Sequence, residues 1–189
     1  MREALPLIAA FATALLLGWA MRRAGIIHRP NQRSNHDQPT PRGGGLGILA
    51  GFFIALALMP EQPPASGAML AGLALCGGIA GLTGLLDDLF TLSETLKFII
   101  LAALSLALAA IAGPVLHLAV NLPWIIGLAG TGLWVFTCSN AVNFMDGSDG
   151  LIAACLIPAC LVLGLTGGGD IAMASFALAA SLAGFAVWN

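Results

Sequence analysis

The residues of this chain best suited to chemistry lie in one short polar stretch between two long apolar runs. Residues 139–151 read Ser-Asn-Ala-Val-Asn-Phe-Met-Asp-Gly-Ser-Asp-Gly-Leu and contain Asn140, Asn143, Asp146 and Asp149. The chain is 59% hydrophobic and 8% charged, and a carboxylate beside a membrane segment is costly and usually functional. Carboxylate and amide oxygens on a glycine-containing turn suit a hard cation such as Mg²⁺, a sugar or a nucleotide. The stretch predicts a ligand site, and the alternative is a helix cap with turn residues.

A second acidic site is the adjacent pair Asp87-Asp88, which follows another long apolar run. Neighbouring carboxylates repel each other, so a cation or a shared proton is expected between or near them. Lys97, the only lysine of the chain, comes shortly after the pair. The pair predicts a charged site at a membrane edge. The structural alternative is that Ser93 caps the helix that follows, with Lys97 as a flanking charge.

A polar loop with several prolines and glycines, residues 29–45, is a third candidate site. Arg33, His36 and Arg42 can meet phosphate groups, and the glycines at 43–45 allow a close backbone approach. Because a glycine-rich stretch alone is a weak signal, a solvated basic loop on the cytoplasmic side is the alternative.

The elements that must position these residues are membrane helices. A mean hydropathy of +0.96 and long uncharged runs predict an all-α, polytopic membrane protein with a single integral-membrane domain over 1–189. We expect seven transmembrane helices, at 4–21, 46–59, 68–86, 96–112, 122–138, 151–165 and 171–188. On a helical approach to the polar stretch, positions 139, 143 and 146 would share a face.

Charge placement predicts the topology. Arg22 and Arg23 follow the first run, so the positive-inside rule places the amino terminus outside. The loops at about 22–44, 87–95 and 139–150 then share the cytoplasmic face. The four cysteines lack Cys-x-x-Cys spacing and are expected to be small core residues. An ion-coupled transporter is a competing class, but transporters favour acids near mid-span, and no predicted span interior holds a charge.

Four segments together resemble one known family. They are Arg33-Ser-Asn-His36, Pro39-Thr-Pro-Arg-Gly-Gly-Gly45, Leu86-Asp-Asp88 and the Asn140–Leu151 stretch. The family is that of the polyprenyl-phosphate N-acetylhexosamine-1-phosphate transferases, the family 4 glycosyltransferases. The first two segments are most similar to the O-antigen-initiating branch, and the asparagine-aspartate stretch is the most specific segment.

The resemblance implies an enzyme of the bacterial plasma (inner) membrane with its active site on the cytoplasmic face. It implies transfer of a sugar 1-phosphate from a UDP-N-acetylhexosamine to undecaprenyl (polyprenyl) phosphate, with release of UMP and with Mg²⁺ as cofactor. This step would start a lipid-linked cell-envelope glycan, such as the O-antigen of lipopolysaccharide, or serve cell wall biogenesis. The implied partners are the UDP-sugar, the lipid phosphate and the membrane, without nucleic acid, and a homodimer is left open.

The resemblance also implies roles for individual residues. Asp87 and Asp88 are the catalytic candidates, with Asp87 deprotonating or orienting the lipid phosphate. The metal candidates are Asn143 and Asp146. The substrate-binding candidates are Arg42, Lys97, Asn140, Asp146 and Asp149.

One departure from the family concerns the end of the sequence. In the family, a span ending in Trp-Asn is followed by a cytoplasmic loop with another essential aspartate, whereas this sequence stops at Asn189. We therefore expect an amino-terminal fragment of a longer protein, inactive by itself. An inactive fragment and an ion-coupled transporter are the alternatives to an active transferase.

Overall fold

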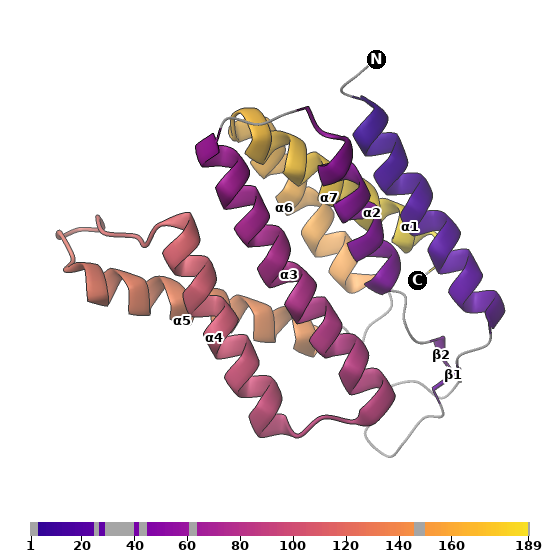
Figure 1. Cartoon of the computed structure of the whole chain (residues 1–189), viewed down its shortest axis with the longest axis horizontal. Coiled ribbons are helices and arrows are strands. Elements are labelled where there is room, and N and C mark those ends of the chain that lie inside the picture. The colour runs from indigo at the N-terminus through magenta and orange to yellow at the C-terminus, as the bar shows by residue number, and fades with distance from the viewer. Residues whose placement is uncertain are drawn as a thin grey trace. The chain divides into compact units, whose positions relative to one another are not determined.

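The computed structural model describes residues 4–24, 27–28, 40–41, 45–60, 64–145 and 150–188 (Figure 1). Within these residues the fold is all-α, as predicted. Its helices are α1 (Ala4–Ala24), α2 (Gly45–Leu58), α3 (Pro64–Phe90), α4 (Glu94–Ala112), α5 (Trp124–Met145), α6 (Leu151–Thr166) and α7 (Gly169–Ala186). The apolar runs form helices because a helix satisfies its own backbone hydrogen bonds where no water is available.

Every predicted span coincides with one helix, and five of the helices are long and apolar enough to cross a membrane. These five are α1, α3, α4, α5 and α7. With 14 and 16 residues, α2 and α6 are shorter. At about 1.5 Å per residue they measure roughly 21 and 24 Å, against a hydrocarbon core of about 30 Å. The class of polytopic membrane protein is confirmed.

A short antiparallel ladder interrupts the helical pattern between α1 and α2. Strand β1 (Ile27–His28) pairs with β2 (Thr40–Pro41), with Ile27 opposite Pro41 and His28 opposite Thr40. Sequence patterns do not predict this ladder, because two residues per strand are too few to show an alternating pattern. The ladder brings together the two ends of the segment that holds Arg33 and His36, which lie outside the described residues.

Two compact units make up the chain. The first joins Met1–Pro63 with Met145–Asn189 and contains α1, α2, α6 and α7. The second is Pro64–Phe144 and contains α3, α4 and α5 up to its last residue. The described candidate site residues all belong to the second unit.

Small residues allow close helix packing in the first unit, where α1, α2 and α7 contact one another and α6 contacts α7. Ala10, Ala55 and Ala177 form a fully buried cluster. A β-carbon added at Gly51 would lie 2.5 Å from the carbonyl oxygen of Ala10, so only glycine fits there. Such small-residue contacts are typical of helix pairs in lipid.

In the second unit, α3 packs against α4 side by side (Figure 1). A β-carbon added at Gly72 of α3 would lie 2.9 Å from Ile111 at the far end of α4. A β-carbon at Gly132 of α5 would lie 2.6 Å from Leu106 of α4. Glycines of α3 and α5 therefore allow close contacts with α4.

The cysteines are all free thiols, so none forms a disulfide. Cys76 and Cys160 are buried, as expected for core residues. Cys138 and Cys155 are exposed, and the prediction that they belong to the core is wrong. Hydropathy does not distinguish a core-facing from an outward-facing cysteine, because both faces of a membrane helix are apolar.

Candidate active site at the ends of α3 and α5

The last turn of α3 carries the acidic pair Asp87-Asp88. The helix ends at Phe90, and the next residue, Thr91, has a left-handed φ of 52°, which is uncommon for a β-branched residue. The backbone N–H of Thr91 donates to the carbonyl oxygen of Asp87 at 2.9 Å. Ser93 then caps α4, so the structural alternative is correct for this serine. The tight turn sets the start of α4 beside the end of α3.

The carboxylate of Asp87 contacts both the turn and α4. Its Oδ1 accepts a hydrogen bond from the backbone N–H of Leu92 at 2.8 Å. Its Oδ2 lies 3.1 Å from Nζ of Lys97, which also donates to Oε1 of Glu94 at 2.9 Å. The side chains of Asp87 and Lys97 are 31% and 30% exposed, whereas that of Glu94 is 91% exposed. The structure thus brings together two of the predicted site residues, Asp87 and Lys97.

The electrostatics of this helix end are unfavourable without a cation. The carboxyl end of a helix carries a partial negative charge, so acidic side chains there are destabilising. Asp88 is exposed and lies about 100° further around the helix axis than Asp87. Lys97 offsets part of the charge of the pair. The functional role of the two carboxylates stays a prediction.

The asparagines of the polar stretch lie on the last turns of α5. This helix continues to Met145, beyond the predicted end of the span at Cys138, so the helical approach to the stretch is confirmed. Asn140 donates from Nδ2 to the carbonyl oxygen of Phe136 at 2.8 Å. Asn140 and Asn143 are both exposed. Both amides thus project from a rigid element.

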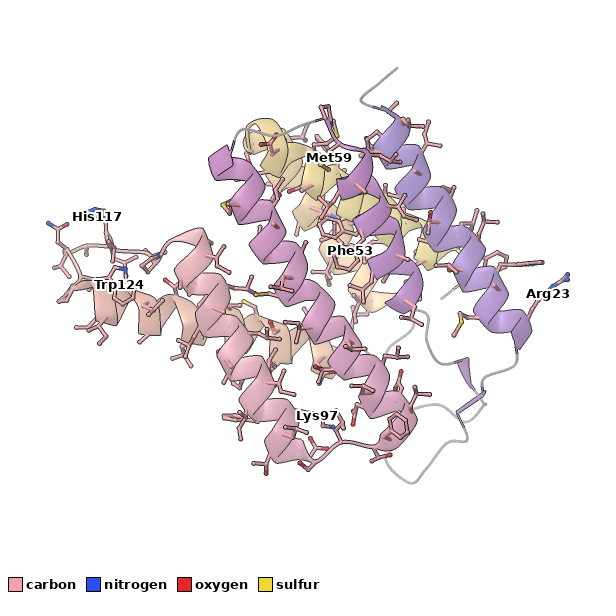
Figure 2. All side chains as sticks on the ribbon, in the orientation of Figure 1. Arg23, Phe53, Met59, Lys97, His117 and Trp124 are labelled. Carbon is pink, nitrogen blue, oxygen red and sulfur yellow. The ribbon has the colours of Figure 1, made fainter. Side chains whose placement is uncertain are left out.

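A ring contact links the start of α4 to the last turns of α5. The rings of Phe98 and Phe136 meet edge to face, with centroids 5.0 Å apart and an interplanar angle of 73°. Phe98 follows Lys97 directly, and Phe136 precedes Asn140 by one turn. The ring contact therefore places the start of α4, where Lys97 lies (Figure 2), beside the part of α5 that leads to the two asparagines.

The remaining predicted site residues lie outside the described residues. They are Arg42, Asp146 and Asp149. Their proximity to the acidic pair stays a prediction. After the gap the chain is described again at Gly150, which has a left-handed φ of 70° and leads into α6. Glycine adopts this conformation without the steric cost of a β-carbon.

Residues 70–189 match the sequence pattern of glycosyl transferase family 4. The chain belongs to this family. The match covers the acidic pair, Lys97 and the whole asparagine-aspartate stretch, whereas Arg42 precedes it. The family resemblance deduced from the motifs is confirmed.

Three curated relatives are all named as transferases that act on undecaprenyl or decaprenyl phosphate. The chain is 31% identical over 137 residues to an undecaprenyl-phosphate alpha-N-acetylglucosaminyl 1-phosphate transferase of Yersinia pestis, covering 69% of the chain and 36% of the relative. It is 31% identical over 163 residues to a decaprenyl-phosphate N-acetylglucosaminephosphotransferase of Mycolicibacterium smegmatis, covering 78% and 40%. It is 27% identical over 191 residues to the Escherichia coli (strain K12) undecaprenyl-phosphate enzyme, covering 94% and 51%. The chain thus spans between about a third and a half of the length of these relatives.

A magnesium site was predicted at Asn143 and Asp146, and of these two residues only Asn143 lies among the described residues. Among the described residues, no group of three acidic, histidine or cysteine side chains is arranged to hold a metal ion. Asn143 offers an exposed amide oxygen on the last turn of α5. Such an oxygen fits Mg²⁺, which usually keeps several waters and takes few protein ligands. The donor chemistry therefore fits, and the ligand set stays a prediction because Asp146 is not among the described residues.

Two residues that shape this site were not predicted. Glu94 shares the ammonium group of Lys97 with Asp87, and its signal in the sequence is the i, i+3 spacing to Lys97 on one helix. Thr91 provides the left-handed turn that presents Leu92 N–H to Asp87. Sequence gives no signal for it, because left-handed residues are expected to be glycine or asparagine.

Proposed function

We propose that this chain carries part of the catalytic site of a transferase that moves an N-acetylhexosamine 1-phosphate from its UDP derivative to polyprenyl phosphate. An oxygen of the lipid phosphate attacks the phosphorus bonded to the sugar. The bond from that phosphorus to the bridging oxygen breaks, and UMP leaves. The family match and the names of the relatives support this reaction, and they favour it over the ion-coupled transporter.

The single observation that carries the proposal in the structure is the Asp87–Lys97 pair at the end of an apolar helix. A lipid phosphate lies at the membrane surface, so its acceptor site must lie at the end of a span. Phosphoryl transfer depends mainly on positioning and charge neutralisation. A fixed carboxylate beside an ammonium group supplies positioning and charge neutralisation at the end of a span.

Each side chain then has a role. Asp87, held by Leu92 and Lys97, orients or deprotonates the lipid phosphate, with Asp88 beside it. Lys97 has three N–H donors, and within the described residues Asp87 and Glu94 use two of them, so the third can donate to a phosphate oxygen. Asn140 and Asn143 face the diphosphate from α5.

The predicted residues outside the described part complete the proposed site. Arg42 binds phosphate, Asp146 binds the metal and the diphosphate, and Asp149 lies near the nucleoside. Bound Mg²⁺ would neutralise charge on the diphosphate. We place the site on the cytoplasmic face of the bacterial inner membrane, where it would start a lipid-linked envelope glycan.

The direct test is lipid-product formation. Membranes containing the chain are incubated with radiolabelled UDP-N-acetylglucosamine and undecaprenyl phosphate, with and without Mg²⁺, and the lipids are extracted. A chimera that appends the remaining length of the Escherichia coli relative is assayed in parallel, because the chain spans 51% of that relative. We expect magnesium-dependent labelled lipid from the chimera.

The matched variants are Asp88→Asn and Asp170→Asn. Asp170 is an aspartate in the first turn of α7, outside every motif. We expect Asp88→Asn to reduce transfer by about tenfold or more, equivalent to about 1.4 kcal/mol in the barrier, and Asp170→Asn to leave it near the parent value. Equal activity of the two variants would remove Asp88 from the site. Absence of labelled lipid from the chimera with every UDP-N-acetylhexosamine would contradict the proposed reaction.

A further inference from the structure

The connection between α4 and α5, residues 113–123, exposes apolar side chains where a water-facing loop would expose polar ones. Val115, Leu118 and Val120 are 49%, 72% and 65% exposed. No Asp, Glu, Lys or Arg occurs between Lys97 and Asp146, so the connection is uncharged throughout. An exposed apolar patch of this kind marks a contact with a membrane or a partner.

Several polar groups of the connection have hydrogen-bond partners in the connection itself or on α5. The ring nitrogen Nδ1 of His117 lies 2.7 Å from Oδ1 of Asn121, and the same residues form an isolated antiparallel bridge. Three backbone N–H groups of the connection also have partners within it or on α5. These bonds are Leu122 N to Leu116 O at 2.8 Å, Leu118 N to Val120 O at 3.2 Å and Val115 N to Thr131 Oγ1 at 2.9 Å. Internal pairing of this kind is what a backbone needs where water is scarce.

The length of α4 indicates where the connection would lie relative to the hydrocarbon core of a membrane. This helix has 19 residues, which at about 1.5 Å each span roughly 28 Å, close to the hydrocarbon thickness of about 30 Å. Lys97 lies at one end of α4, and His117 and Trp124 lie near the other end (Figure 2). Trp124, 56% exposed, begins α5, and tryptophan is enriched at membrane–water interfaces.

The loop between α6 and α7 differs in composition from the α4–α5 connection. It consists of glycines at 167–169 followed by Asp170, and a β-carbon at Gly168 would meet nothing within 4 Å. This loop has the composition of a water-facing turn. The α4–α5 connection, with its leucines and valines, does not.

We propose that the α4–α5 connection lies in the membrane interface, with its apolar side chains among the acyl chains and headgroups of the leaflet opposite the acidic site. Its partner is the lipid surface itself. Burying apolar area there anchors one end of α4. The anchor fixes the depth of α4 and hence the level at which Asp87 and Lys97 meet the other surface. The proposal depends on the membrane fold and not on the transferase reaction.

The test is a depth measurement on the whole chain. Leu118→Cys, Val120→Cys and the matched control Gly168→Cys are made in a background whose native cysteines are replaced by alanine. Each variant carries a nitroxide label in vesicles of phosphatidylethanolamine and phosphatidylglycerol. Collision rates with oxygen, which concentrates in lipid, and with a water-soluble nickel chelate give the depth of each label.

We expect the oxygen-to-nickel ratio to be severalfold higher at 118 and 120 than at 168. Equal ratios at the three positions would overturn the proposal, because the connection would then face water. Protection of 118 and 120 from both reagents would also overturn it, because a protein contact rather than lipid would cover the connection. The unlabelled background supplies the blank.

Discussion

The carboxylate of Asp87 has two contacts that differ in kind. The hydrogen bond from Leu92 N–H holds the turn after α3, whereas the contact with Lys97 compensates charge. Exposed ion pairs contribute little to stability, but these two side chains are each about 30% exposed and are fixed by the turn. The effect of the hydrogen bond from Leu92 N–H can therefore be separated from the effect of the charge by substitution of Asp87.

We predict that Asp87→Asn and Asp87→Ala differ in stability but not in activity. Asparagine keeps an oxygen facing Leu92 N–H and removes the charge, whereas alanine removes both. We expect each to lower transfer by about tenfold or more, and only alanine to lower the unfolding free energy, by about 1 kcal/mol for the lost hydrogen bond. Transfer assays and thermal unfolding in detergent measure the two effects. Near-normal turnover of Asp87→Asn would assign the residue to the turn alone.

Residue types predicted the acidic pair and the α5 asparagines because polar groups stand out in an apolar chain. The pairing of Lys97 with Asp87 was predicted only as proximity along the chain. Its geometry depends on the left-handed Thr91, and a threonine carries no signal for that conformation. Local backbone geometry was therefore the part of the site that sequence could not supply.

At the scale of elements, apolar runs located every helix but not every helix end. α3 extends to Phe90 and α5 to Met145, past the predicted limits at Leu86 and Cys138. Hydropathy marks where a helix leaves the membrane, whereas the helix itself ends where its hydrogen bonding is interrupted. The polar residues of interest lie in these extensions, so the site is built on helix ends more than on loops.

We predict that Gly51→Val destabilises the first unit, whereas Gly77→Val does not. A β-carbon at Gly51 would lie 2.5 Å from the carbonyl oxygen of Ala10 and 2.9 Å from Oγ of Ser181. A β-carbon at Gly77, on α3, meets nothing within 4 Å. Overpacking typically costs about 1–3 kcal/mol. Thermal unfolding in detergent compares the variants, and equal midpoints would show that α2 can move away from α1.

At the scale of the whole chain, packing contacts give the directions of the helices in each unit. Gly47 of α2 lies against Ala14 of α1, and Gly51 lies against Ala10, so α2 runs antiparallel to α1. Rising residue numbers on one helix meet falling numbers on the other. The short α2 therefore returns along α1, as a second crossing requires.

The other contacts agree with this alternation. Ala177 of α7 clusters with Ala10, and Gly184 lies against Ala14, so α7 runs parallel to α1. Phe176, near the start of α7, lies against Gly164 near the end of α6, so these two helices are antiparallel. If the chain crosses the membrane with every helix, the first and seventh helices run in one direction, and the second and sixth run in the opposite direction. The directions within the first unit have this pattern.

We therefore predict seven crossings with the amino terminus outside, which places the polar segments on one face. Ser34→Cys and Ser148→Cys report on segments outside the described residues, and Gly168→Cys reports on the α6–α7 loop. With a membrane-impermeant maleimide, we expect positions 34 and 148 to react only in inverted vesicles and position 168 to react in spheroplasts. If α2 stayed on one side, α3 would run the opposite way and carry Asp87 to the face opposite Ser34. Labelling of Ser34→Cys or of Ser148→Cys from outside would contradict the predicted topology. If only one of the two were labelled from outside, residues 29–45 and residues 139–151 would lie on opposite faces and could not share a site.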